Sequence, residues 1–230
     1  MVLLVVSNHV SDPEKGRREG ARLGQICARI AAVEFEVVHF ASLPAWLERH
    51  GHRVLGMISC GFPDDYASFD LERQRPQMEY MRRSAVPVLG ICGGHQIMAM
   101  AFSGECGPMD RGAREEGFNK VYRAAGGNQL GPEASGRVRG EAGPWGALDR
   151  GLPDCFEVWQ EHYWEVKRVP AGFRVLLTGE TCRVQGVQHC GRPLGGVQFH
   201  PEKSDRSHPH GESIIGNFLQ WCGVRPGPVG

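Results

Sequence analysis

Short apolar runs alternate with helix-like segments through the first half of the chain. Residues 2–6, 35–40, 54–59 and 86–91 have the length and apolar character of buried strands. Between them, residues 14–32, 43–49 and 71–84 carry apolar positions at helical spacing. This alternation predicts an α/β fold with a central, mostly parallel twisted sheet that is flanked by helices on both faces.

The second half has a different pattern, in which strand-like runs follow one another with turns between them. These runs are residues 118–124, 156–160, 173–178, 184–189 and 194–199, and a last helix is expected at 214–221. We interpret them as antiparallel strands added to the sheet, together with a closing strand. The Gly-rich stretch 126–146 reads as a loop or partly mobile flap, which is more typical of a surface insertion than of a substrate lid.

The whole pattern predicts one domain over residues 1–222 and a flexible Gly/Pro tail at 223–230. Gly16, Gly20 and Gly24 recur every four residues in the first expected helix. They either let the helix approach a neighbouring backbone closely or are simply weak helix positions near the surface. The second interpretation is favoured.

Cys92 lies between the apolar run 86–91 and the start of an apolar helical pattern. The local sequence is Gly90-Ile91-Cys92-Gly93-Gly94-His95-Gln96. A tight strand-to-helix turn exposes the side chain at its apex and requires small neighbours. The helix N-terminus favours a thiolate, so Cys92 is a candidate nucleophile rather than a buried structural cysteine.

A second motif, far downstream, supplies a matching base. Residues 195–204 read Gly-Gly-Val-Gln-Phe-His-Pro-Glu-Lys-Ser, which places His200 at the end of a short strand. Pro201 stops the strand, and the Glu202 carboxylate can fold back to the imidazole. Cys92, His200 and Glu202 together have the composition of an activated-nucleophile triad.

Both motifs resemble those of the class I (triad) glutamine amidotransferases, in the order and at about the separation of that family. The family includes the glutaminase parts of GMP synthetase, carbamoyl-phosphate synthetase and anthranilate synthase, and the likeness covers nearly the whole chain to about Cys222. It implies a flavodoxin-like fold. It also implies hydrolysis of L-glutamine to glutamate and ammonia through a Cys92 thioester.

The resemblance assigns further residues to the site. Gln96 stands where relatives contact the substrate with a glutamine side chain. The oxyanion hole would use the N–H groups of Gly93 and Phe62, and Gly61 would contact substrate. The family usually has glycine at the position of Phe62. The Phe62 ring is expected to crowd the substrate, and its Cβ excludes some backbone conformations. The oxyanion hole is therefore expected to stay unformed until substrate or a partner reorders the loop.

The loop 160–166 would hold the α-groups of glutamine, partly through the backbone of Tyr163 and Trp164. Glu161 is unusual in this loop: its carboxylate could meet the α-ammonium or simply face water, and the second is favoured. The pair Glu116-Gly117 matches a common family pairing, for which a structural role is expected.

Composition argues against some classes of partner and favours one cellular location. The 26 basic and 26 acidic residues balance to a net charge of zero, which argues against a nucleic-acid partner. No apolar run is long enough for a membrane span or signal peptide. Eight cysteines without a regular framework are typical of free thiols in a reducing compartment, so we expect a cytoplasmic protein.

We expect neither a metal nor a cofactor. Several cysteines and histidines of the second half are of the residue types that bind zinc, but they lack the paired spacing of a zinc site. These residues are Cys182, His189, Cys190, His200, His208 and His210. The sequence holds no phosphate-binding Gly-x-x-x-x-Gly-Lys-Ser/Thr motif. Ammonia is therefore expected to pass to a separate synthase subunit.

Two alternatives remain open from the sequence. The same triad could serve a stand-alone γ-glutamyl peptidase or hydrolase, or the chain could be a non-catalytic regulatory subunit that kept the fold.

Overall fold

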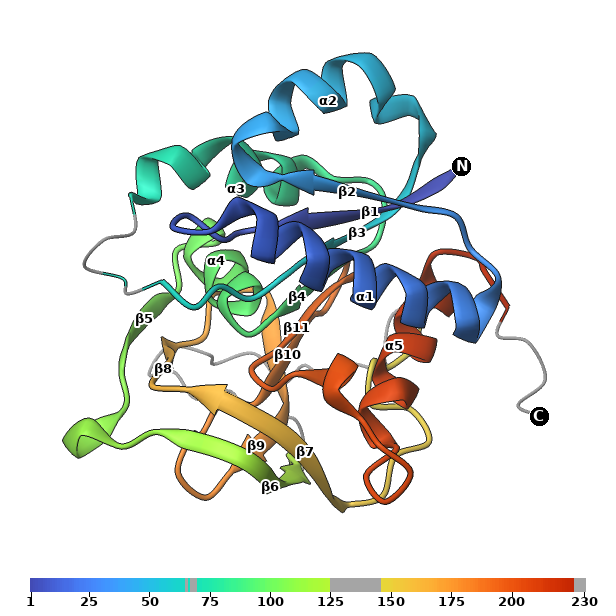
Figure 1. The fold of residues 1–230 in the computed structure, drawn as a ribbon. Coiled ribbons are helices and arrows are strands. Elements are labelled where there is room, and N and C mark those ends of the chain that lie inside the picture. The colour runs from blue at the N-terminus through green and yellow to red at the C-terminus, as the bar shows by residue number, and fades with distance from the viewer. Residues whose placement is uncertain (65, 67–69, 125–145, 226–230) are drawn as a thin grey trace.

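The computed structural model describes residues 1–64, 66, 70–124 and 146–225. Figure 1 shows these residues built around one large sheet with helices on either side. The expected loop at 126–146 and most of the tail at 223–230 lie outside the described residues.

Nine strands form this sheet in the order β2-β1-β3-β4-β11-β10-β9-β6-β7. Their bounds are β1 Val2–Ser7, β2 Phe35–His39, β3 Val54–Ser59, β4 Val88–Ile91, β6 Glu115–Arg123, β7 Cys155–His162, β9 Phe173–Gly179, β10 Gly186–His189 and β11 Leu194–Val197. The run from β2 to β11 is parallel, and the pairings from β11 to β7 are antiparallel. This confirms the mixed α/β sheet.

Helices cover both faces of the parallel part. Helices α1 (Pro13–Ala31) and α5 (His210–Trp221) pack on one face with one set of buried side chains. Helices α2 (Leu43–His50), α3 (Leu71–Arg83) and α4 (Gly93–Ala101) pack on the other. Successive residues of β1 point to opposite faces, so Leu3 and Val5 belong to the first core while Val2 and Leu4 belong to the second.

The favoured interpretation of the α1 glycines is wrong. Gly16, Gly20 and Gly24 are buried, and α1 lies directly on the sheet at these positions. A Cβ atom at Gly24 would lie 2.2 Å from Phe35 Cδ2, and one at Gly16 would lie 2.2 Å from Ser7 Oγ. The glycines therefore permit close packing of helix on strand.

A two-stranded sheet formed by β5 (Glu105–Pro108) and β8 (Trp164–Arg168) was not expected from the sequence. Its strands have mixed charged and apolar residues without clear alternation. Pairing with each other, rather than any local pattern, makes them strands. This small sheet holds the segment that follows His162 beside α4.

The pairing of β4 with β11 positions the two motifs. These strands are parallel, with Val88 opposite Leu194 and Ile91 opposite Val197. Their carboxyl ends therefore meet at the same edge of the sheet. Cys92 and His200 follow at that edge, which is where α/β sheets bind their ligands.

Candidate active site

Cys92 lies on a strained turn between β4 and α4. Its backbone has φ 49° and ψ −110°, a conformation that costs a non-glycine residue about 1–3 kcal/mol. The glycines around it are required by packing. A Cβ atom at Gly94 would lie 2.0 Å from the carbonyl oxygen of Ser59, and one at Gly90 would lie 2.6 Å from that of Gly94.

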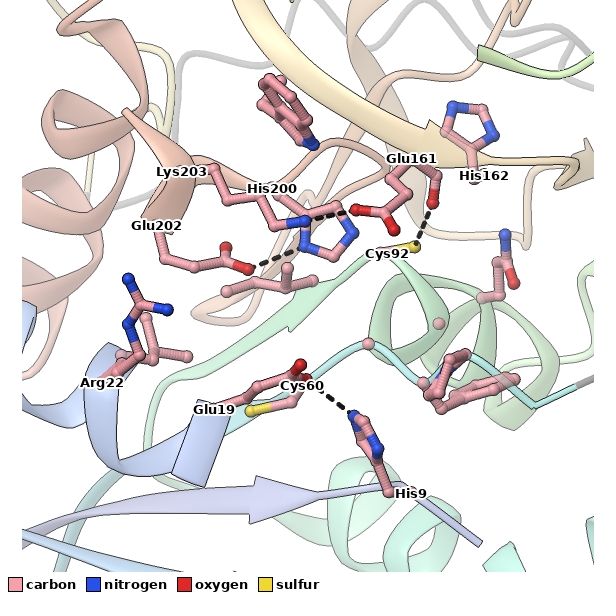
Figure 2. A pocket seen from close by; sticks show the side chains of 18 of the residues that line it. His9, Glu19, Arg22, Cys60, Cys92, Glu161, His162, His200, Glu202 and Lys203 are labelled. Carbon is pink, nitrogen blue, oxygen red and sulfur yellow. Dashed lines mark hydrogen bonds and ion pairs between the residues drawn. The ribbon is translucent and has the colours of Figure 1, made fainter. Parts of the chain in front are cut away.

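His200 meets Cys92 at the carboxyl edge of the sheet (Figure 2). A Cβ atom at Gly61 would be 3.2 Å from Cys92 Cβ and 3.4 Å from His200 Cε1, so both side chains border the same point. The His200 backbone N–H donates to the carbonyl of Trp159 at 2.9 Å. On the other side of the ring, Nδ1 lies 2.7 Å from Glu202 Oε1.

Charge around His200 favours the imidazolium form. Burial by itself lowers the pKa of His200, but the Glu202 carboxylate and the hydrogen-bonded Cys92 sulfur outweigh burial and raise it well above the usual range. The same pair lowers the pKa of Glu202 against the effect of its own burial. The three predicted triad residues are thus together and electrostatically coupled.

Phe62 lies against the predicted oxyanion hole. A Cβ atom at Gly93 would fall 2.2 Å from Cε1 of the Phe62 ring, so the ring covers the Cα of the residue after the nucleophile. Phe62 also packs edge-on against Tyr66 at 5.2 Å between centroids. The ring therefore occupies space beside Cys92, and its crowding of the substrate stays a prediction.

Gln96 lines the cavity, and its carboxamide is already engaged. Its Nε2 donates to the carbonyl of Trp164 at 2.9 Å and to Gln198 Oε1 at 3.0 Å. Its Oε1 accepts a hydrogen bond of 2.5 Å from the Tyr66 hydroxyl. A substrate group that used this oxygen would compete with Tyr66, whose ring stacks on Trp164 at 4.1 Å.

The segment after β7 closes the other side of the site. The Tyr163 carbonyl accepts from the Met109 N–H at 2.8 Å, and the Trp164 carbonyl accepts from Gln96. Both carbonyls are thus held by neighbouring parts of the fold, and His162 Nδ1 also lies 3.0 Å from the Trp164 carbonyl. Glu161 has a side chain that is 53% exposed and forms an ion pair with Lys203, so it faces solvent but is not alone.

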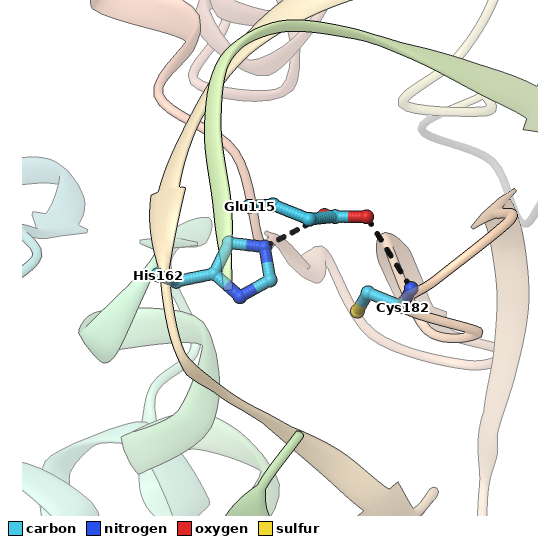
Figure 3. A group of neighbouring side chains, drawn as sticks. All are labelled: Glu115, His162 and Cys182. Atoms are coloured by element: carbon cyan, nitrogen blue, oxygen red, sulfur yellow. Dashed lines mark hydrogen bonds and ion pairs between the residues drawn. The ribbon is translucent and has the colours of Figure 1, made fainter. Parts of the chain in front are cut away.

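A buried cluster behind this segment brings together Glu115, His162 and Cys182 (Figure 3). Their potential metal-ligand atoms lie within 4.8 Å of one another. Glu115 Oε2, however, already contacts His162 Nε2 at 3.0 Å and accepts from Gln185 Nε2 at 2.7 Å. Burial also raises the pKa of the Cys182 thiol well above its usual range, which opposes the thiolate form that metals bind. Hydrogen bonding accounts for the cluster, and the absence of a metal stays a prediction.

A cleft with a cavity volume of about 690 Å³ joins these features. Cys92, His200 and Glu202 line it, and so do Gly61, Phe62, Gly93, Gln96, Tyr163 and Trp164. Every site residue predicted from the sequence thus borders one cavity.

Sequence reasoning missed three residues: Tyr66 and Lys203, which line the cavity, and Gln198, which is buried against Cys92. Gln198 Nε2 donates to Cys92 Sγ at 3.7 Å, and its place in the motif of His200 was a usable signal. Lys203, next to Glu202, carried the same signal. Tyr66 gave no signal in the sequence, because only the path of the loop after β3 brings it to Gln96.

None of the helices in the described part of the chain is long and apolar enough to cross a bilayer.

Comparison with known proteins adds independent information. Residues 28–221 match the model of the class-I glutamine amidotransferase family. The chain is 33% identical over 172 residues to a glutamine-hydrolyzing GMP synthase subunit of Methanocaldococcus jannaschii, covering 75% of this chain and 76% of that protein. It is 37% identical over 146 residues to the subunit of the same name from Thermococcus kodakarensis, covering 64% and 65%.

Solved structures agree on the fold. A protein from Thermoplasma acidophilum aligns over 97% of this chain and 94% of its own, with a TM-score of 0.70 and 24% identity. A glutamine amido transferase from Methylobacillus flagellatus aligns over 99% and 96%, with a TM-score of 0.64 and 17% identity.

Proposed function

Because the chain belongs to the class-I glutamine amidotransferase family, we propose that it hydrolyses L-glutamine to glutamate and ammonia through a thioester on Cys92. One observation carries this most: Cys92 stands on a strained turn in contact with His200, whose other nitrogen is held by Glu202 at 2.7 Å. A nucleophile, a base and an orienting carboxylate are the requirements for covalent amide hydrolysis.

In the first half-reaction, the Cys92 thiolate attacks the side-chain amide carbon and a carbon–sulfur bond forms. The N–H groups of Gly93 and Phe62 stabilise the oxyanion. The His200 imidazolium gives its proton to the leaving nitrogen, the carbon–nitrogen bond breaks, and ammonia departs. In the second half-reaction, neutral His200 takes a proton from water, which attacks the thioester and releases glutamate and the thiolate.

The ammonia passes to a separate synthase subunit in this proposal. The relatives at 33% and 37% identity are named as one subunit of a GMP synthase, which supports a partner chain as acceptor. All eight cysteines are free thiols, which supports a reducing, cytoplasmic location. The Phe62 ring lies against Gly93, next to the space that the substrate oxyanion would occupy. We therefore propose that glutaminase activity is low until the synthase subunit moves this loop.

Glutaminase assays of Cys92→Ala test the proposal, with and without the synthase subunit. We expect a loss of at least about 10³-fold in kcat, since the covalent route disappears. Cys155→Ala is the matched control, because this exposed thiol lies outside the cavity. A glutamine-analogue electrophile should label Cys92 alone. A fully active Cys92→Ala protein would eliminate the mechanism.

A γ-glutamyl hydrolase is the second candidate, because a cavity of about 690 Å³ has room beyond a single glutamine. Comparing kcat/KM for L-glutamine and γ-glutamyl peptides separates the two functions. A clear preference for the peptides would replace the first proposal with the second.

A further inference from the structure

A buried glutamine contacts the sulfur of Cys92. Gln198 directly follows β11, is fully buried, and donates from Nε2 to Cys92 Sγ at 3.7 Å. Its backbone N–H donates to the Gln185 carbonyl at 2.9 Å, which holds the chain at this point. His200, two residues further on, hydrogen-bonds to the same sulfur. One short segment therefore brings two side chains to Cys92.

The hydrogen bonds around Gln198 fix which end of its carboxamide faces the sulfur. The Trp164 carbonyl can only accept, so the side-chain nitrogen of Gln96 must face it, at 2.9 Å. The same nitrogen lies 3.0 Å from the Gln198 carboxamide, which must therefore present its oxygen there. The other end of Gln198, its NH2 group, then faces Cys92. The Trp164 carbonyl, two hydrogen bonds away, thus determines that the sulfur meets a donor.

This contact distinguishes the two charge states of the sulfur. A hydrogen bond to an ionised acceptor is stronger than one between neutral groups, so the Gln198 N–H stabilises the thiolate more than the thiol. The Glu161 carbonyl oxygen, 3.9 Å from Sγ, has the opposite effect because it can accept only from the thiol. Cys92 is 6% exposed, so little of its surface is open to water that could replace a lost donor. The Gln198 amide therefore acts in favour of the nucleophilic form.

Gln198 differs from the titratable groups at this end of the cavity. His200 contacts the sulfur, and Glu202 acts through the His200 ring. The Tyr66 hydroxyl donates to the Gln96 side chain. The imidazole gives up and takes back a proton in each catalytic cycle, whereas an amide keeps its N–H throughout. Gln198 is thus a permanent donor to the sulfur.

We propose that Gln198 is a further catalytic residue, which stabilises the Cys92 thiolate through its side-chain N–H. This inference rests on the proposed function, because it adds a group to that mechanism. The donor favours the thiolate before it attacks the amide carbon. In the second half-reaction the carbon–sulfur bond breaks and its electron pair returns to the sulfur, and the same N–H stabilises the departing thiolate.

The pH dependence of Cys92 alkylation tests the contact without glutamine. Iodoacetamide reacts with the thiolate, and peptide mass spectrometry follows Cys92 separately from the other cysteines. Gln198→Met keeps the length of the side chain but has no N–H. We expect this change to move the half-maximal alkylation rate to higher pH by about one unit or more, and to lower kcat/KM for L-glutamine by about tenfold or more.

Gln188→Met is the matched control. Gln188 is also a buried glutamine, on the neighbouring strand β10, where its carboxamide accepts from the Leu148 N–H and donates to the Gly146 carbonyl. Its loss removes a buried amide of the same kind away from the cavity, so it should destabilise the fold without moving the alkylation profile. An equal shift in both variants, or no shift in Gln198→Met, would overturn the proposal.

A second measurement keeps the Gln198 side chain in place. Its NH2 signals, followed by NMR, should change with pH at the midpoint found for alkylation of the wild-type protein. The change should vanish in Cys92→Ala, where His200 still titrates. Signals that do not follow Cys92, or that change equally in Cys92→Ala, would overturn the proposal whether or not Gln198→Met folds.

Turnover of L-glutamine by the unmodified protein with its synthase subunit is measured in parallel. If turnover occurs but the alkylation profile does not shift, the role of Gln198 alone is wrong. If no turnover occurs, the proposed function fails, and the catalytic role of Gln198 fails with it.

Discussion

At the scale of single residues, Glu202 controls the charge of His200. Their contact of 2.7 Å raises the pKa of the imidazole well above its usual range despite burial and lowers that of the carboxyl. The contact also orients the ring that the proposed mechanism uses as acid and base beside Cys92. The orientation of one ring thus links the two motifs chemically.

Glu202→Gln should lower the pKa of His200 and reduce kcat by about 10²-fold or more, since the charged form of the ring loses its partner. Titration of the His200 ring followed by NMR measures the first effect, and glutaminase assays measure the second. An unchanged titration midpoint would contradict the coupling.

The same variant should reveal a stability window in pH. Because the His200 pKa is raised on folding, its contribution is present below the ordinary histidine pKa and is lost as pH rises through the raised value. Because the Glu202 pKa is lowered, its contribution is lost as pH falls through the lowered value. The difference in free energy of unfolding between wild type and Glu202→Gln should therefore be largest between these limits. A difference independent of pH, measured by urea denaturation, would argue against the ion pair.

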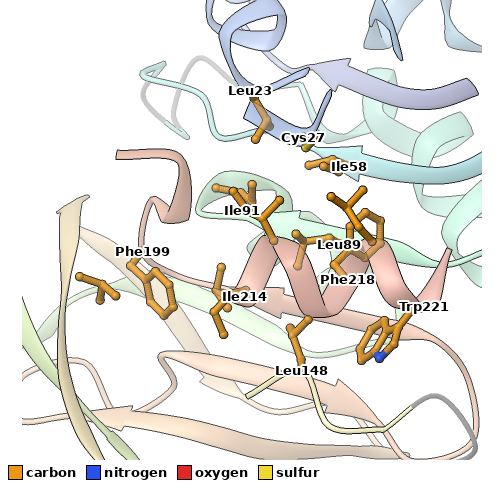
Figure 4. Close-up of a cluster of buried hydrophobic side chains, with 14 of the residues drawn as sticks. Leu23, Cys27, Ile58, Leu89, Ile91, Leu148, Phe199, Ile214, Phe218 and Trp221 are labelled. Atoms are coloured by element: carbon orange, nitrogen blue, oxygen red, sulfur yellow. The ribbon is translucent and has the colours of Figure 1, made fainter. Parts of the chain in front are cut away.

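At the scale of elements, the packing of α1 places one wall of the cleft. Figure 4 shows Leu23 and Cys27 of α1 beside Ile58, in the core that also holds Phe218 of α5. The buried glycines of α1 bring the helix against β1 and β2. The glycine stripe gives up helix propensity of about 1 kcal/mol per residue in return for this close contact.

Gly24→Ala should destabilise the protein although alanine is the better helix former. The new Cβ would lie 2.2 Å from Phe35 Cδ2, and overpacking of this kind costs about 1–3 kcal/mol. We expect a fall in Tm of about 2–12 °C in thermal unfolding. Gly216→Ala in α5 is the matched control, because its nearest neighbour would be Ile30 Cγ2 at 3.8 Å, and it should stabilise by up to about 1 kcal/mol. Stabilisation by both changes would contradict the close-packing interpretation.

At the scale of the whole molecule, one sheet carries Cys92 and His200, the proposed nucleophile and base, after the ends of two adjacent strands. β4 and β11 are the last parallel pair of the sheet, and β11 also pairs with β10, where the antiparallel part begins. The antiparallel part contributes to the site as well, because the His200 N–H donates to the carbonyl of Trp159 in β7. This arrangement favours the single domain expected from the sequence.

We expect the protein to unfold in one cooperative transition. Trp46 of α2 and Trp159 of β7 report on the two parts, and each can be followed by fluorescence in a variant that keeps it as the only tryptophan. Their urea midpoints should coincide with each other and with the loss of far-UV circular dichroism. Separate midpoints would mean that the parallel and antiparallel parts are independent folding units.

The sequence by itself predicted the chain order of the helices and of the strands in the large sheet, the turn at Cys92, and the three residues that we propose as a triad. Local patterns suffice for these, because apolar periodicity follows from backbone geometry and a nucleophile turn requires glycines at fixed neighbouring positions. The predicted run 54–59 coincides with β3, and the others differ from the observed strands mainly at their ends. The sequence also pointed to Gly61, Gln96 and Trp164, which line the cavity.

Only the tertiary structure decided how the site is closed. The Phe62 ring over Gly93, the Tyr66 hydroxyl on Gln96 and the Glu161–Lys203 pair each join segments that no local pattern connects. The burial of the α1 glycines and the pairing of β5 with β8 depend in the same way on what lies opposite. Contacts of this kind are set by strand register and by the path of loops, because a side chain's partner across the fold is determined by packing rather than by its neighbours in sequence.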